Sequence, residues 1–291
     1  MNQDTKPLAL TVIGAGTMGH GIAQVAALAG LGVTLVDADP GALERGRRKI
    51  DENLAGGIAR GKLTAADRDR TVANLATATS AAVGARAADL VIEAVVEKLE
   101  VKQALFAELE RVAPPHAILA SNTSSLPLAK IAAPLADPTR LIGMHFFNPV
   151  FLMKLVELVV HPKTGEAAKR LALDVVQRMG KTAIVVKDSP GFASSRLGVI
   201  LGLEAIRMVE QGVASPADID TAMELGYNHP MGPLKLTDLV GLDVRLAIAD
   251  TLVREIGGDQ YRAPQLLRDK VARGELGKKS GQGFYDWSAR A

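Results

Sequence analysis

The sequence of 291 residues contains no cysteine. This absence excludes disulfides, thiolate metal sites and cysteine nucleophiles. The chain also lacks a strong charge imbalance, since its formal net charge is only +2. Proteins that bind nucleic acid usually present a strongly basic face, so we expect no nucleic-acid partner.

Long apolar runs are missing as well. Residues Met1–Pro7 lack the basic start and the apolar stretch of a signal peptide. The longest apolar runs, such as Leu8–Ile13, stop far short of the roughly 20 residues that span a bilayer. We therefore expect a soluble cytoplasmic protein without a membrane partner.

Short apolar runs recur through the first part of the chain, each followed by glycine or polar residues. Such runs suit strands buried on both faces of a parallel sheet. The stretches between them are rich in alanine, leucine and charge, and this alternation predicts an α/β fold with a doubly wound sheet. The expected strands are 8–13, 33–36, 90–92 and 117–120, and the expected helices between them are 18–29 and 100–112.

Residues 42–73 break this alternation because they are charge-rich and too long for one crossover helix. We expect a projecting helical hairpin with a break marked by Gly56, Gly57 and Gly61. Three further strands are expected over 141–147, 154–160 and 182–186, with a turn at Asn148-Pro149 between the first two.

No strand-like run follows Asp188, and helices are expected over 197–211, 216–225 and 237–256. The sequence thus predicts an α/β domain over residues 1–187 and an all-α domain over residues 188–291.

A glycine-rich loop directly follows the first expected strand and opens a helix. Residues 14–19, Gly-Ala-Gly-Thr-Met-Gly, match the pattern G-x-G-x-x-G. Gly14 permits the tight turn, Gly16 lets the backbone approach a pyrophosphate, and Gly19 lets helix and strand pack closely. The helix N-terminus, with Thr17 and Met18, offers N–H groups to the phosphates.

Asp37 closes the second strand, 18 residues after Gly19. This is the position of the acid that accepts hydrogen bonds from the adenosine ribose, and its charge opposes a 2′-phosphate. We therefore predict a Rossmann-like domain that binds NAD rather than NADP. FAD shares the fingerprint, and a plain strand-turn-helix with an acidic cap is the alternative.

One of the five histidines stands out. No pair has the spacing of a zinc site, so we expect no metal. His145 lies near the end of an expected strand of the hairpin 141–160. If the hairpin is centred on Phe151, His145 and Glu157 are six residues from the centre on either side and face each other. Such a carboxylate can stabilise a protonated imidazole, so the pair is a candidate general acid–base unit. A structural core histidine with a carboxylate partner is the alternative.

Ordered motifs along essentially the whole chain carry a resemblance to a known family. The chain resembles the short, single-function 3-hydroxyacyl-CoA dehydrogenases, often called 3-hydroxybutyryl-CoA dehydrogenases. Besides the glycine loop, the motifs are 93–97 (EAVVE), 121–125 (SNTSS), 145–149 (HFFNP), 188–192 (DSPGF), 231–233 (MGP) and 277–285 (GKKSGQGFY).

The resemblance implies NAD-dependent oxidation of a (3S)-3-hydroxyacyl-CoA to the 3-ketoacyl-CoA, in fatty acid metabolism. It implies His145 as the catalytic base and Glu157 as its orienting carboxylate. It also implies that Ser124 bonds the substrate oxygen, that Asn148 lies near the nicotinamide and the reacting oxygen, and that both residues contribute to the cofactor site. Three further residues are implied to line the NAD site: Glu97, Lys102 and Lys279.

The substrate side of the site departs from the family. Most relatives have an asparagine where this chain has Ser195, which is shorter and would need a water or a small shift. The helical hairpin places Asn53, Arg60 and Lys62 near positions that grip CoA in relatives, although a solvated helix face is the alternative.

The resemblance further implies a homodimer formed by the helical domain, whose apolar helices need cover. Two other functions stay open: a related dehydrogenase of gulonate-like sugar acids, and a non-catalytic NAD-binding protein on the same fold.

Overall fold

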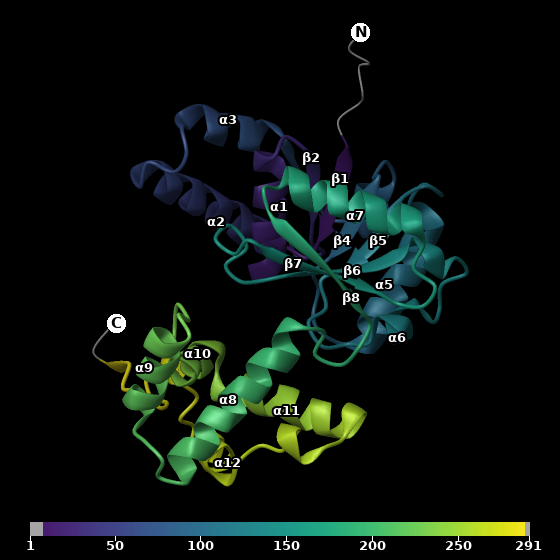
Figure 1. Cartoon of the computed structure of the whole chain (residues 1–291). Coiled ribbons are helices and arrows are strands. Elements are labelled where there is room, and N and C mark those ends of the chain that lie inside the picture. Colours follow the sequence, from purple (N-terminus) through teal and green to yellow (C-terminus); the bar gives the residue numbers. More distant parts are fainter. Residues whose placement is uncertain (1–7, 289–291) are drawn as a thin grey trace. The chain divides into compact units, whose positions relative to one another are not determined.

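The computed structural model describes residues 8–288, and the chain divides into two compact units between Asp188 and Ser189 (Figure 1). The prediction that Met1–Pro7 is not a signal peptide concerns residues outside this described part. Between residues 8 and 288, none of the helices has the length and apolar character needed to span a bilayer.

A mixed sheet forms the centre of the first unit (Figure 1). The described strands follow the order β3-β2-β1-β4-β5-β6-β7-β8, in which β1 to β6 are parallel. Strand β7 is antiparallel to β6, and β8 is parallel to β7. The strands are β1 Ala9–Ile13, β2 Gly32–Val36, β3 Leu75–Ala78, β4 Leu90–Glu93, β5 Ile118–Ser121, β6 Leu141–Phe146, β7 Leu155–Val160 and β8 Thr182–Lys187.

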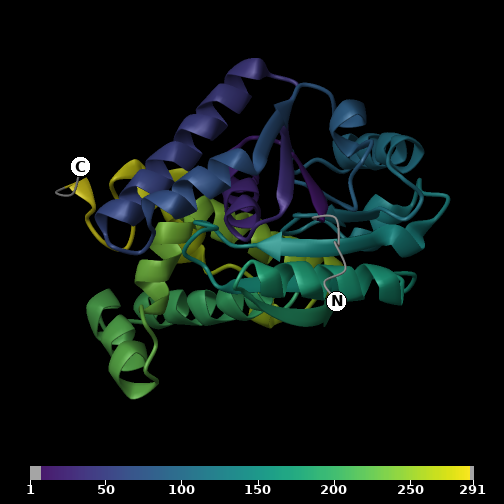
Figure 2. The ribbon, with the colours of Figure 1, turned by 90° about the horizontal axis from the view of Figure 1, so that it is seen from above.

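Helices cover both faces of this sheet, which confirms the doubly wound α/β prediction (Figure 2). One apolar core joins side chains of α1, α2 and α7 to the strands and includes Val12. On the other face, the Thr11 hydroxyl donates a hydrogen bond of 2.7 Å to the Gly84 carbonyl of α4, and the Thr11 side chain points the opposite way from Val12. The helices are α1 Thr17–Leu28, α2 Pro40–Ala59, α3 Ala65–Ala73, α4 Ala81–Ala85, α5 Leu99–Val112, α6 Leu128–Ala132, η1 Pro138–Arg140 and α7 Glu166–Arg178.

The expected helical hairpin is present as α2 and α3. Thr64 caps α3 through a reciprocal pair of hydrogen bonds with Asp67. The break lies at Gly61, where φ is +64°, a conformation that glycine adopts without strain. The expectation that Gly56 and Gly57 also mark the break is wrong, because α2 continues through both.

Helices build the second unit, and its described residues contain isolated β-bridges at Gln282 but no strand. The helices are α8 Ser194–Glu210, α9 Pro216–Gly226, α10 Pro233–Val240, α11 Leu242–Ile256, η2 Asp259–Tyr261, α12 Gln265–Ala272 and η3 Lys278–Ser280. The prediction of one helix over 237–256 is wrong. The chain turns at Gly241, with φ +103°, so that α10 ends and α11 begins there. Asp238 then accepts hydrogen bonds from the Phe284 and Tyr285 amides, which ties the last segment to α10.

Candidate active site

The β6–β7 hairpin brings His145 and Glu157 together. The two strands pair in antiparallel register with His145 directly opposite Glu157, which confirms the predicted register. Side chains alternate along a strand, and the neighbours Met144 and Leu158 belong to the core that α7 covers. His145 and Glu157 therefore share the opposite face of the sheet.

The two side chains form a close polar pair. Nδ1 of His145 lies 2.7 Å from Oε2 of Glu157. Because an ionised carboxylate only accepts hydrogen bonds, Nδ1 carries the hydrogen in this contact. Glu157 is fully buried and His145 is 7% exposed, and the ring of Phe147 lies 4.5 Å from the imidazole. The carboxylate thus fixes the imidazole orientation and can stabilise positive charge on it.

A cavity of about 350 Å³ lies beside His145. It is built by loops that follow β4, β5 and β6, at the carboxyl edge of the sheet, where α/β proteins bind their ligands. The Oδ1 atom of Asn122 accepts a hydrogen bond from the Phe146 amide and joins the loop after β5 to the end of β6. The structure brings several predicted residues together here; the cavity is lined by Met18, Ala94, Val95, Glu97, Asn122, Ser124, His145, Phe146, Phe147 and Asn148.

A buried charge network supports one wall of this cavity. Lys102 and Glu93 are both almost fully buried, and Nζ of Lys102 lies 2.5 Å from Oε1 of Glu93. The same ammonium lies 3.1 Å from Oε2 of Glu97. Ser121 donates a hydrogen bond to the other Glu93 oxygen. Lys102 does not line the cavity itself, but it is linked to it through its ion pair with Glu97, which does. Glu93 is not among the predicted site residues, although an acid at the end of an apolar strand is a usable signal for one.

Glu97 connects this network to the loop after β5. Its Oε1 accepts hydrogen bonds from the Thr123 hydroxyl and from the Ser124 and Ser125 amides. Burial acts to raise the pKa of the Glu97 carboxyl, but the Lys102 charge and the hydrogen bonds outweigh it and hold that pKa below its usual value. An ionised Glu97 therefore positions Ser124 at the cavity.

The glycine loop has the geometry that a bound dinucleotide needs. Gly14 has φ +101°, and a Cβ there would lie 2.5 Å from the Ala94 carbonyl oxygen. A Cβ on Gly19 would lie 1.6 Å from the Gly14 carbonyl oxygen, so only glycine allows this close packing. A Cβ on Gly16 would meet open space, and within the described chain no side chain caps the start of α1. That open N-terminus fits a pyrophosphate.

Asp37 stands beside a second cavity, of about 240 Å³. Its carboxylate accepts hydrogen bonds from the Ala15 and Asp39 amides, at 2.8 and 3.0 Å. Each carboxylate oxygen can accept a further bond, so Asp37 can still bind ribose hydroxyls. Val95 lines both this cavity and the one beside His145. The two cavities thus flank one loop and suit the two ends of a dinucleotide.

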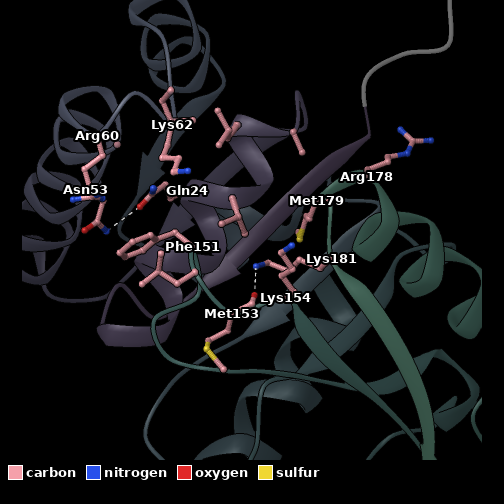
Figure 3. Close-up of a pocket in the computed structure, with 17 residues that line it drawn as sticks. Gln24, Asn53, Arg60, Lys62, Phe151, Met153, Lys154, Arg178, Met179 and Lys181 are labelled. Carbon is pink, nitrogen blue, oxygen red and sulfur yellow. Dashed lines mark hydrogen bonds between the residues drawn. The ribbon is translucent and has the colours of Figure 1, made fainter. Parts of the chain in front are cut away.

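A third and larger pocket, of about 590 Å³, lies between the helical hairpin and the β6–β7 turn (Figure 3). We call it the basic pocket. The three predicted CoA residues Asn53, Arg60 and Lys62 all line it, and Asn53 donates a hydrogen bond to Gln24 at 3.0 Å. The wall across from them carries Lys154 and Lys181 (Figure 3). The remaining lining residues are Val25, Leu28, Ala29, Gly57, Leu63, Phe151, Leu152, Met153, Arg178, Met179 and Gly180.

Two predicted site residues belong to the second unit. Ser195 lies in the first turn of α8. Lys279 lies in η3, where its Nζ is 2.6 Å from an Asp243 carboxylate oxygen. Their contribution to a site in the first unit stays a prediction.

Comparison with known proteins identifies the family. Residues 9–189 match the model of the 3-hydroxyacyl-CoA dehydrogenase NAD binding domain, and residues 191–287 match that of the family's C-terminal domain. The chain belongs to the 3-hydroxyacyl-CoA dehydrogenase family. It is therefore an oxidoreductase of this family with an NAD-binding domain, as the motifs predicted.

Individual relatives agree with this assignment. The chain is 46% identical to a probable 3-hydroxybutyryl-CoA dehydrogenase of Bacillus subtilis, over 97% of this chain and 98% of that protein. It is 44% identical to a human mitochondrial hydroxyacyl-coenzyme A dehydrogenase, over 96% and 90% of the two chains. The crystal structure of a Ralstonia eutropha (S)-3-hydroxybutyryl-CoA dehydrogenase superposes with a TM-score of 0.93 at 39% identity, covering 97% of this chain and 99% of that one.

Proposed function

We propose that the protein interconverts (3S)-3-hydroxybutyryl-CoA and acetoacetyl-CoA with NAD, using His145 and Glu157 as its acid–base pair. The observation that carries this proposal is the His145–Glu157 contact of 2.7 Å inside a cavity that adjoins the glycine loop. The names of the relatives support a four-carbon acyl group.

The residues present fit NAD. The open start of α1 suits the pyrophosphate, and Asp37 suits a ribose without a 2′-phosphate. NAD supplies the hydride acceptor when it is bound. The chain supplies binding groups and a proton acceptor. Ser124 and Asn148 line the same cavity as His145.

The proton step follows from the geometry of the pair. His145 would accept the proton of the substrate 3-hydroxyl at Nε2, since Nδ1 faces Glu157. Glu157 would stabilise the imidazolium that forms, because the opposite charge lies at hydrogen-bond distance in a buried site. Ser124 and Asn148 would donate hydrogen bonds to the substrate oxygen and hold it toward His145. In reduction the protonated His145 returns the proton.

The basic pocket supports an acyl-CoA substrate. Its lining combines apolar side chains, for an adenine or pantetheine group, with the cations Arg60, Lys62 and Lys154, for phosphates. A sugar acid carries no group that would use such a pocket, so the pocket favours a CoA thioester.

A homodimer and a cytoplasmic location stay proposals from the sequence. Apolar side chains on α9 to α11 support the dimer, because Leu225, Leu236, Leu239 and Val244 are all exposed. Burial of these side chains by a second copy would remove apolar surface from water. Light scattering of the purified protein tests it, and a single-subunit mass would contradict it.

The experiment that tests the proposed activity is a rate survey. Oxidation of NADH and NADPH would be followed with 3-ketoacyl-CoA substrates from four carbons upward and with a keto-sugar acid. We expect the highest kcat/KM with acetoacetyl-CoA and NADH. Turnover of the sugar acid alone would favour the gulonate-type activity, and binding of NADH without any turnover would favour a non-catalytic protein.

A further inference from the structure

The turn between β6 and β7 borders two sites at once. Asn148, near its start, lines the cavity beside His145, and residues 151–154 line the basic pocket. The last pair of the β6–β7 ladder is Phe146 with Val156. The strand ladder therefore does not hold the turn itself, and other contacts must fix its position.

Two anchors outside the turn do so. On one side, the buried side chain of Val150 packs against α1 at Gly21, where a Cβ would come within 2.9 Å of the Val150 Cβ. On the other side, Nζ of Lys181 donates hydrogen bonds to two main-chain carbonyls of the turn. The distances are 2.6 Å to the Val150 oxygen and 2.7 Å to the Met153 oxygen. Figure 3 shows Lys181 beside Met153 and Lys154, on the wall of the basic pocket across from Asn53 and Arg60.

The setting of Lys181 is unusual for a lysine. The side chain is partly buried, and this burial lowers the pKa of its ammonium group. Among the ion pairs of the described residues, none pairs Lys181 with a carboxylate. Its charge is instead stabilised by two carbonyl dipoles, and charge-assisted bonds of this kind are about twice as strong as neutral ones. Each carbonyl would lose its partner if the ammonium were removed.

We propose that Lys181 is a positioning residue that holds the β6–β7 turn, so that Asn148 and residues 151–153, which line the basic pocket, keep their places beside the substrate. This inference rests on the proposed function. Lys181 acts through the turn and needs no contact with the reacting atoms. A displacement of about 1 Å in a substrate-positioning group can lower turnover by about 100-fold.

The test compares Lys181→Met, Lys181→Arg and the control Lys163→Met, which removes the same charge from an exposed lysine outside the site. Each variant is assayed with acetoacetyl-CoA and with acetoacetyl-pantetheine, a truncated thioester without the nucleotide. We expect Lys181→Met to lower kcat about 10- to 100-fold with both substrates while the Kd for NADH stays unchanged. Lys181→Arg should restore most of kcat, and Lys163→Met should match the wild type.

Two results would overturn the inference. If Lys181→Met raised only KM, and only for acetoacetyl-CoA, Lys181 would be a direct ligand of the nucleotide end. If kcat were unchanged with both thioesters, the hydrogen bonds from Lys181 to the turn would have no role in turnover.

Hydrogen exchange of the amides of residues 150–154 is a readout that needs no substrate. We expect faster exchange in Lys181→Met, or in Lys181→Gln if the methionine variant does not fold. Unchanged exchange would show that Lys181 does not hold the turn. A wild-type enzyme without turnover would refute the proposed function. The exchange result would still show whether Lys181 holds the turn.

Discussion

Replacement of Glu157 by glutamine isolates the charge of the acid–base pair. The amide oxygen of Glu157→Gln can still accept the hydrogen of His145 Nδ1, so the imidazole keeps its orientation. What disappears is the negative charge 2.7 Å from the ring. In oxidation the imidazole gains a positive charge as it takes the substrate proton, and the variant cannot stabilise that charge.

The size of the effect follows from the separation and the burial. Two unit charges with centres about 4 Å apart interact by about 4 kcal/mol at an effective dielectric constant of 20. The amide dipole of glutamine recovers from almost none to about half of this, which leaves a loss of about 2 to 4 kcal/mol in the transition state. Each 1.36 kcal/mol corresponds to about a tenfold change in rate, so kcat should fall about 30- to 1,000-fold.

The assay is steady-state oxidation of 3-hydroxybutyryl-CoA with NAD, accompanied by the Kd for NADH. We expect kcat to fall while the NADH Kd and the melting temperature stay near those of the wild type. Glu166→Gln is the matched control because Glu166 is an exposed glutamate on α7. Full activity of Glu157→Gln would refute the electrostatic role of the pair, and a parallel loss of NADH affinity would show that the change disturbs the cofactor site.

Three further predictions concern the surroundings of the site. Asp37→Ala should raise the Kd for NADH by about 10-fold and reduce discrimination against NADPH, because the ribose loses its acceptor. Titrations with both cofactors would contradict this if the ratio of the NADPH Kd to the NADH Kd stayed at its wild-type value. Lys102→Met should lower the free energy of unfolding by about 3 to 5 kcal/mol, since it leaves the buried Glu93 charge unpaired. The double change with Glu93→Gln should recover most of that loss in denaturant unfolding, and no recovery would contradict the pairing. Burial lowers the pKa of His161, so its neutral form stabilises the fold fully above pH 6.5, and this stability is lost as pH falls through the lowered folded pKa. His161→Gln should reduce the loss of unfolding free energy as the pH falls below 6.5, and an unchanged slope in that range would exclude His161 as its source.

Much of the site could be predicted because it depends on local patterns. A symmetric hairpin fixes its own register, so counting from Phe151 was enough to pair His145 with Glu157. The glycine loop likewise encodes its geometry in glycines that a Cβ would clash with, as at Gly14 and Gly19.

Tertiary contacts account for what the sequence could not predict. Strand β3, Leu75–Ala78, is an edge strand with exposed residues at its centre and no clear apolar alternation. Gly241 is compatible with either a helix interior or a helix break in the sequence, and its φ of +103° in the structure shows that α10 ends and α11 begins there. Lys102 looks like a solvated lysine on a helix, but the fold buries it between two acids. Lys181 bonds main-chain carbonyls, which no residue pattern displays.

We propose that His145 exchanges the proton with the substrate, while NAD binds independently on the glycine loop. The most direct test measures turnover of acetoacetyl-CoA and the Kd for NADH in His145→Ala. We expect kcat to fall by about 100- to 10,000-fold, the range of a lost general acid, with an unchanged NADH Kd. Turnover within a few-fold of the wild type, or a loss of NADH binding that matches the loss of rate, would contradict it.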